Sequence, residues 1–223
     1  MVEMFLADLF EFLKSLPNLL NVSACNIDMA IYLPRSDLLI LLPAKCGSTW
    51  IRRAVTTLND AHYFLGPREL RGHGTLAFYG RNFSKIAAFI RHPYTWHVSY
   101  WNYRTFVLGF WEPERAPMDR ACSHLPFSQY VACVYANLPN CVGDYYSRFI
   151  GPPNARISFI GKLESLESDF TRLLTESGVS FDVERLSAIP KANVQHTRHE
   201  DASLRHLVFQ HEAKLYQEFQ YSV

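Results

Sequence analysis

The chain has 223 residues, and its 22 basic and 21 acidic side chains leave a formal net charge of +1, which gives no global attraction to nucleic acid or to a polyanionic glycan. With 48% hydrophobic and 14% aromatic residues, the composition is that of a globular chain, so intrinsic disorder is not expected. We expect a single domain over residues 1–223, because this length suits one α/β core and is short for two. Because the near-neutral net charge gives no global attraction to anions, any anion-binding site must be local.

The N-terminal stretch, residues 1–16, repeats apolar side chains at helical spacing and ends before Pro17. We expect an amphipathic helix that covers the sheet, with docking to a membrane surface or a partner as the alternative. Charged residues interrupt this stretch, unlike the core of a signal peptide, and no later stretch reaches the ~18 apolar residues of a membrane span. The five cysteines are scattered without a CxxC pair, so we expect a reduced, cytoplasmic protein.

The chain is organised around residues 37–55, DLLILLPAKCGSTWIRRAV. Residues 38–42 form an apolar run typical of a buried parallel strand, and Pro43 ends it because proline cannot donate to the ladder. Gly47 gives the following turn room to bend, and a helix is predicted over residues 48–58. The order strand, tight loop and helix start directs backbone N–H groups and the positive end of a helix dipole toward one spot.

The loop adds a lysine ammonium from Lys45 and the hydroxyl groups of Ser48 and Thr49, so it is typical of a phosphate or sulfate site. It differs from the ATP-binding pattern GxxxxGK[ST], because Lys45 precedes Gly47 instead of following a second glycine. The alternative is an ordinary strand-to-helix turn that carries a surface lysine.

Strands and helices alternate along the rest of the chain, which indicates an α/β fold in which helices cover both faces of a central parallel sheet, a three-layer sandwich. The stretch 17–36 is predicted as loop with one short strand, 59–74 as a long loop and 109–125 as an excursion from the core. The predicted strands are 85–90 and 157–160, and the predicted helices are 94–107 (capped by Thr95), 128–138, 163–178 and 202–219.

Arg91 directly follows the predicted strand 85–90, in the same topological position as the loop of Lys45. Because the carboxyl ends of neighbouring parallel strands share one crevice, Lys45 and Arg91 are expected to converge on one ligand. Ser99 lies eight residues after Arg91 on the following helix and can add a hydroxyl donor to the same anion.

Three segments together resemble a known family. PAKCGSTW, RHPYTWHVSYW and FIGKLESLESDF are similar to the three signature motifs of sulfotransferases that use 3′-phosphoadenosine 5′-phosphosulfate, PAPS. The eight-residue interval from Arg91 to Ser99 matches the second motif, and Leu163, Glu164, Leu166 and Asp169 match the third. The motifs fall in the family's order and span residues 38–174. The resemblance implies a P-loop NTPase-like fold and transfer of a sulfuryl group from PAPS to an acceptor hydroxyl.

The resemblance also implies roles for single residues. Lys45 would contact the bridging oxygen and the 5′-phosphate, and Arg91 and Ser99 would hold the 3′-phosphate. Lys191 and Asn193 are similar to a basic stretch of the carbohydrate-directed members and would close over the cofactor. The implied cofactor-binding set, which serves PAPS and its product PAP, is completed by Cys46, Gly47, Ser48, Thr49 and Trp50, the last of these near the adenine.

An acceptor hydroxyl needs a base, and the family places its catalytic histidine or glutamate between the first two motifs. His73 is our first choice and Glu69 the second, since an imidazole is suited to accept a proton at neutral pH. The acceptor is expected to be a small molecule or a carbohydrate. Its predicted pocket is lined by aromatic residues, namely Phe64, Tyr79, Trp101, Phe106 and Trp111.

Two alternatives remain from the sequence: a P-loop kinase, and a non-catalytic nucleotide-binding module that docks a partner. The position of the lysine counts against the kinase. One departure from the family is Ala44, which stands between the proline and the lysine of the loop. No metal is expected, because the spacing of the C-terminal histidines matches no zinc pattern: His196, His199, His206 and His211.

Overall fold

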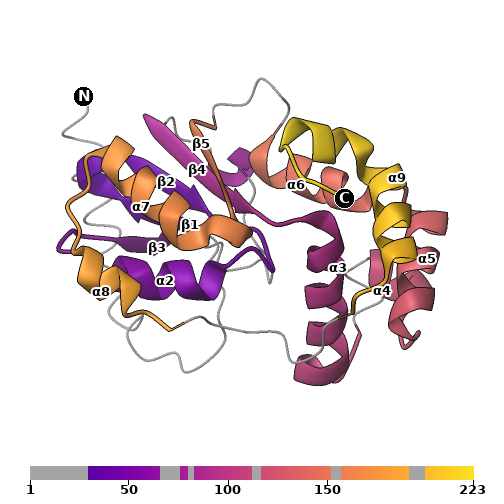
Figure 1. Ribbon diagram of the computed structural model, residues 1–223. Helices are drawn as coiled ribbons and strands as arrows, with labels where there is room; N and C mark the ends of the chain where they lie inside the picture. Colours follow the sequence, from indigo (N-terminus) through magenta and orange to yellow (C-terminus); the bar gives the residue numbers. More distant parts are fainter. Residues whose placement is uncertain (1–29, 66–75, 80–82, 112–116, 152–156, 191–198) are drawn as a thin grey trace.

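The structure is a computed structural model that describes residues 30–65, 76–79, 83–111, 117–151, 157–190 and 199–223, so the predicted helix over residues 1–16 lies outside the described residues. A five-stranded sheet in the order β3-β1-β2-β4-β5 lies beside a group of helices (Figure 1). The strands are β1 (Ala30–Leu33), β2 (Leu38–Leu41), β3 (Tyr63–Leu65), β4 (Lys85–Ile90) and β5 (Phe159–Lys162). The α-helices are α2 (Ser48–Thr56), α3 (Pro93–Asn102), α4 (Pro117–Cys122), α5 (Phe127–Asn137), α6 (Cys141–Ile150), α7 (Leu166–Ser177), α8 (Val183–Ser187) and α9 (Ala202–Glu218).

The sheet is mixed, which corrects the prediction of a parallel sheet. The strands β2, β4 and β5 run parallel to one another, whereas β1 is antiparallel to both β2 and β3. The connection between β1 and β2 is one turn of 3-10 helix, η1 (Pro34–Ser36), followed by Asp37 in the left-handed conformation. A link this short can join only antiparallel neighbours, because a parallel pair needs a crossover of a dozen residues or more.

Helices and short segments cover both faces of the sheet. Successive side chains of a strand point to opposite faces, and in β1 and β2 both sets are apolar and buried. On one face Ile31, Ile40 and Phe89 pack in a cluster with residues of α2, α7 and α8. On the other face Tyr32 and Leu39 pack with the end of α6 and with η2 (Leu76–Tyr79). The α/β class is therefore confirmed, and the buried strands are continuous apolar runs because neither face meets solvent.

Most of the predicted helices are present, with changes at their ends. Strand 85–90 and the helices α2, α5, α7 and α9 lie close to their predicted bounds. His92, not Thr95, caps α3, since its Nδ1 accepts a hydrogen bond from the backbone N–H of Tyr94 at 3.2 Å. The helix predicted to reach residue 107 changes after Asn102 into a π-helix, η3 (Tyr103–Leu108). Helices α4, α6 and α8 and strand β3 were not predicted from the sequence. The stretch 109–125, predicted as an excursion from the core, contains α4, and its Met118 and Cys122 are buried in the core.

Helices α3, α4, α5, α6 and α9 gather around a second core beside the sheet (Figure 1). Within the described residues, no helix has the length and apolar character that crossing a membrane requires.

A buried carboxylate joins three of these helices. Glu212 of α9 is fully buried, and its Oε1 accepts hydrogen bonds from the Tyr135 hydroxyl at 3.1 Å and the Val142 backbone N–H at 2.7 Å. Its Oε2 accepts a third from the backbone N–H of Gly143 at 2.9 Å. Glu212 thus caps the N-terminus of α6, where exposed N–H groups and the helix dipole favour a negative charge. Burial still raises the pKa of Glu212 from 4.5 to about 7, and the three hydrogen bonds oppose that rise.

This carboxylate makes the stability of the fold depend on pH. The pKa of Glu212 is higher in the folded state than the usual 4.5. The contribution of Glu212 to the free energy of unfolding is therefore full below pH 4.5 and is lost as the pH rises through about 7. Glu212→Gln should flatten this decline, which is at most on the order of 3 kcal/mol in the free energy of unfolding. Urea denaturation at a series of pH values measures it. Glu218→Gln, an exposed position of the same helix, is the control. An unchanged pH profile in Glu212→Gln would contradict the assignment.

Candidate functional site

The loop between β2 and α2 makes its turn with two left-handed residues. Lys45 has a φ of 68° and Gly47 a φ of 88°. Gly47 is the N-cap of α2, and its carbonyl accepts the first helical hydrogen bond from Ile51 N–H at 3.1 Å. The strand, the tight loop and the helix start predicted for this stretch are therefore confirmed, and the first N–H groups of α2 point toward the loop side.

Gly47 brings the first motif against the third. A Cβ atom built on Gly47 would lie 2.8 Å from Cδ2 of Leu166 and 3.0 Å from Cδ1 of Leu163. The loop can approach the start of α7 this closely only because glycine has no side chain. The two segments singled out by the sequence resemblance are thus in direct contact.

Two tyrosines of α6 hold the ends of β2 and β4 together. The Tyr145 hydroxyl accepts the Ala44 backbone N–H at 2.7 Å. The Tyr146 hydroxyl accepts the Arg91 N–H at 3.0 Å and donates to the Arg91 carbonyl at 2.8 Å. Burial raises the pKa of both tyrosines well above the ordinary value, so both hydroxyls keep their protons. Helix α6 therefore fixes the positions at which both cationic side chains leave the backbone.

The inserted residue Ala44 is fixed at both of its backbone polar groups. In addition to the bond from its N–H to Tyr145, its carbonyl accepts a hydrogen bond from Nε1 of Trp96 at 3.1 Å and from the Cys46 thiol at 3.4 Å. Cys46 is buried, and burial raises the pKa of its thiol to about 12. A neutral, buried thiol fills space and donates to the loop, so Cys46 acts as a packing residue within the predicted cofactor site.

Arg91 lies against the loop of Lys45, as the crevice argument predicted. Its Nη1 donates to the Lys45 carbonyl at 3.3 Å, and its Nε donates to the Thr95 hydroxyl at 2.9 Å. Burial lowers the pKa of Arg91, while nearby acidic groups, Glu164 among them, oppose the shift. The guanidinium is thus held in place on two sides while its charge is incompletely solvated.

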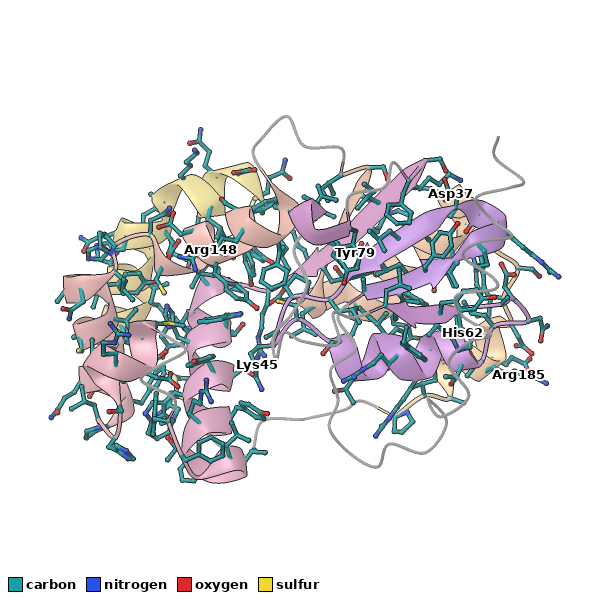
Figure 2. The ribbon with its side chains drawn as sticks, turned by 180° about the vertical axis from the view of Figure 1, so that it is seen from behind. Asp37, Lys45, His62, Tyr79, Arg148 and Arg185 are labelled. Atoms are coloured by element: carbon teal, nitrogen blue, oxygen red, sulfur yellow. The ribbon has the colours of Figure 1, made fainter. Side chains whose placement is uncertain are left out.

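Lys45 lies between α2 and α3 (Figure 2), with its Nζ 3.9 Å from the centre of the Tyr103 ring. Its pKa is lowered from 10.5 to about 8, first by burial and then by the positive charges of Arg91 and Arg104. The Tyr103 ring provides a cation–π contact, which offsets part of the lost hydration. Two cations held in one desolvated spot repel each other, and a bound anion would relieve that repulsion.

Helix α3 presents a row of polar side chains to this spot. Thr95 and Ser99 follow Arg91 at intervals of four residues, and Tyr103 continues the series. Thr95 and Ser99 share one face of α3. Arg91, just before the helix, contacts the loop at one end of this face, and Tyr103, the first residue of the π-helix, contacts Lys45 at the other. Ser99 is half-buried and lies between them. Thr95 and Tyr103 were not predicted as site residues from the sequence, although successive steps of four residues lead from Arg91 through both.

The start of α2 contributes two half-buried hydroxyl residues, Ser48 and Thr49. Trp50 is buried, and its ring packs edge-on against Phe170 of α7 at 5.6 Å between centroids. This contact places Trp50 in the core beneath the loop. The adenine contact implied by the resemblance stays a prediction.

The acidic residues of the third motif hold backbone turns. Glu164 accepts the His92 backbone N–H at 2.9 Å through Oε1, which ties the 3-10 turn Leu163–Ser165 before α7 to the start of α3. Asp169 accepts the Lys162 backbone N–H at 2.8 Å and the Ser165 hydroxyl at 2.7 Å. Both carboxylates position the loops around the site, since each satisfies N–H groups at the end of a strand.

Four predicted site residues, His73, Glu69, Lys191 and Asn193, lie outside the described residues. Two of the aromatic residues expected in an acceptor pocket, Trp101 and Trp111, line a cavity of about 300 Å³ together with His124 and Leu125. Trp101 donates to the Leu125 carbonyl at 2.9 Å, so it faces the loop between α4 and α5. Trp101 lies two residues from Ser99 along the helix, which places this cavity on the side of α3 opposite Lys45.

No known family model and no curated protein matches the chain. Among the described residues, no group of three or more His, Cys, Asp or Glu side chains is arranged to hold a metal ion.

The contact between the loop and α7 can be tested at Gly47. Gly47→Ala places a side chain on a backbone with positive φ and brings its Cβ too close to Leu163 and Leu166. We therefore expect a loss of about 2 kcal/mol or more in the free energy of unfolding. Gly178→Ala is the matched control, because Gly178 has a φ of 71° but nothing within 4 Å of the added Cβ. Urea denaturation of both variants separates strain from contact. Equal losses would show that the contact has no effect.

Proposed function

We propose that the protein is a PAPS-dependent sulfotransferase, which moves a sulfuryl group from PAPS to a hydroxyl of an acceptor. The observation that carries the proposal is the approach of Arg91 to Lys45, with the Arg91 Nη1 at 3.3 Å from the Lys45 carbonyl. These two cations leave the carboxyl ends of the parallel neighbours β2 and β4. PAPS offers two separate anionic groups, a 5′-phosphosulfate and a 3′-phosphate, and so requires two cationic positions.

The proposal assigns residues to each part of the cofactor. The loop from Lys45 to Thr49 would bind the 5′-phosphosulfate, and the Arg91 fork with Ser99 would bind the 3′-phosphate. Lys191 and Asn193 would close over the cofactor. The finer architecture belongs to the same proposal: the parallel part of the sheet, β2, β4 and β5, would be the central layer of a P-loop NTPase-like sandwich.

The chemistry follows from where charge develops. As the bond to sulfur breaks, the leaving bisphosphate gains negative charge on the bridging oxygen. A fixed ammonium from Lys45 would stabilise that charge, and the bound anion would raise the lowered pKa of Lys45 and keep it protonated. His73, or Glu69 in its place, would accept the proton of the attacking hydroxyl in an in-line transfer.

Binding of PAP, the product nucleotide, tests the two-cation site directly. We expect calorimetry to show tighter binding of PAP than of ATP, and tighter binding of PAP than of adenosine 5′-phosphate, which lacks only the 3′-phosphate. Arg91→Lys keeps the charge but loses the planar fork, so its PAP affinity should fall about 10-fold to 100-fold while its affinity for adenosine 5′-phosphate changes little. Tighter binding of ATP than of PAP would favour the kinase and reject the sulfotransferase.

Turnover tests the role of Lys45 in leaving-group stabilisation. Lys45→Ala should lower kcat by about 10²-fold to 10³-fold and weaken PAP binding by a smaller factor, because the contact strengthens in the transition state. The assay follows labelled sulfate from PAPS into a panel of phenols, sugars and apolar alcohols, with Lys214→Ala in the exposed part of α9 as control. Comparable losses in binding and turnover would contradict the leaving-group role. PAP binding without transfer to any acceptor would instead support a non-catalytic module.

A further inference from the structure

Two cysteines meet between α4 and α5, away from the loop of Lys45. Cys122, the last residue of α4, is fully buried, and its Sγ lies 2.6 Å from Sγ of Cys133. Cys133 is half-buried on α5, and its own thiol donates to the Ala121 carbonyl at 3.3 Å. Both cysteines are free thiols in this structure. A disulfide bond is about 2.04 Å long, so the two sulfur atoms need to move by only about half an ångström to form one.

A third cysteine nearby has a different partner. The Cys141 thiol of α6 donates to the sulfur of Met118 at 3.2 Å. Met118 lies on α4 together with Cys122, so three thiols are gathered around one short helix. The pairing is nevertheless specific, because Cys122 contacts Cys133 and Cys141 contacts the thioether.

We propose that Cys122 and Cys133 form a reversible disulfide by exchange with a low-molecular-weight disulfide such as oxidised glutathione. The Cys133 thiolate attacks one sulfur of glutathione disulfide, which forms a mixed disulfide and releases one glutathione thiolate. The Cys122 sulfur, after losing its proton, then attacks Sγ of Cys133 and releases the second glutathione. Two protein thiols are oxidised and one glutathione disulfide is reduced to two thiols, so atoms and electrons balance.

The order of the two steps follows from exposure. Cys133 reaches solvent and can meet the small disulfide, whereas Cys122 is enclosed. Burial also raises the pKa of Cys122 to about 12, which makes the second step the slower one and makes it faster at higher pH.

The bond would anchor a helix that supports the anion site. Asp119 lies one turn before Cys122 and is fully buried, with its carboxylate 2.9 Å from Nε of Arg104 and 2.7 Å from the Tyr100 hydroxyl. Arg104 adjoins Tyr103, whose ring lies under Nζ of Lys45. A covalent link between α4 and α5 therefore holds Asp119 under the π-helix that carries Tyr103.

The test uses the full chain, first reduced and then incubated with oxidised glutathione at about pH 8, near the ordinary thiol range. After the free thiols are alkylated, chymotrypsin cleaves after Phe127 and Tyr135 and places Cys122, Cys133 and Cys141 on three peptides. Mass spectrometry without reduction should show the peptide of Cys122 joined to that of Cys133, with two of the five thiols lost. The melting temperature should rise by about 5 °C and return after dithiothreitol.

Variants separate the pair from the neighbouring thiol. Cys141→Ala should form the same link, whereas Cys133→Ser and Cys133→Ala should form none and show no rise in melting temperature. A stable glutathione adduct on Cys133 without the link, or a link between Cys133 and Cys141, would overturn the proposal. A correct link with an unchanged melting temperature would overturn the anchoring of α4.

Discussion

The candidate site depends on two tyrosine hydroxyls that α6 inserts between the ends of β2 and β4. Tyr145 fixes the backbone of Ala44, and Tyr146 fixes both backbone polar groups of Arg91. Buried N–H and carbonyl groups must be paired, so the loops that leave the two strands take the positions in which these hydroxyls satisfy them. Glu212 in turn holds the start of α6 from α9, which links the C-terminal helix to the placement of both cations.

The electrostatics of the site favour the binding of an anion. Lys45 and Arg91 are each desolvated and close to the other, and both have a lowered pKa. The Tyr103 ring lies under Nζ of Lys45, and the Thr95 hydroxyl accepts a hydrogen bond from Nε of Arg91. Cationic groups that are already fixed need no reorganisation when an anion binds, which is the arrangement that charge-stabilising catalysis requires.

The sequence predicts the parts of the fold that local pattern specifies. Strands β2 and β4 and the helices α5, α7 and α9 are evident from apolar runs or helical spacing, and the meeting of Lys45 with Arg91 follows from the rule for parallel strands. The antiparallel pairing of β1 depends on a short turn and on β3, a three-residue strand with little pattern of its own. Helix α6 does carry a helical signal, Val142, Tyr146 and Phe149. The backbone groups that its tyrosines bind are set by the tertiary structure, and no local pattern specifies them.

The left-handed backbone of Lys45 also determines which residue types fit this position without strain. A residue with a side chain pays roughly 1 kcal/mol or more in this conformation, and glycine or asparagine would avoid most of it. Folding alone would therefore favour one of those two residues in a loop that must also accommodate Ala44. The chain instead has a lysine at this left-handed position, so the loop gives up some stability and gains a fixed ammonium group.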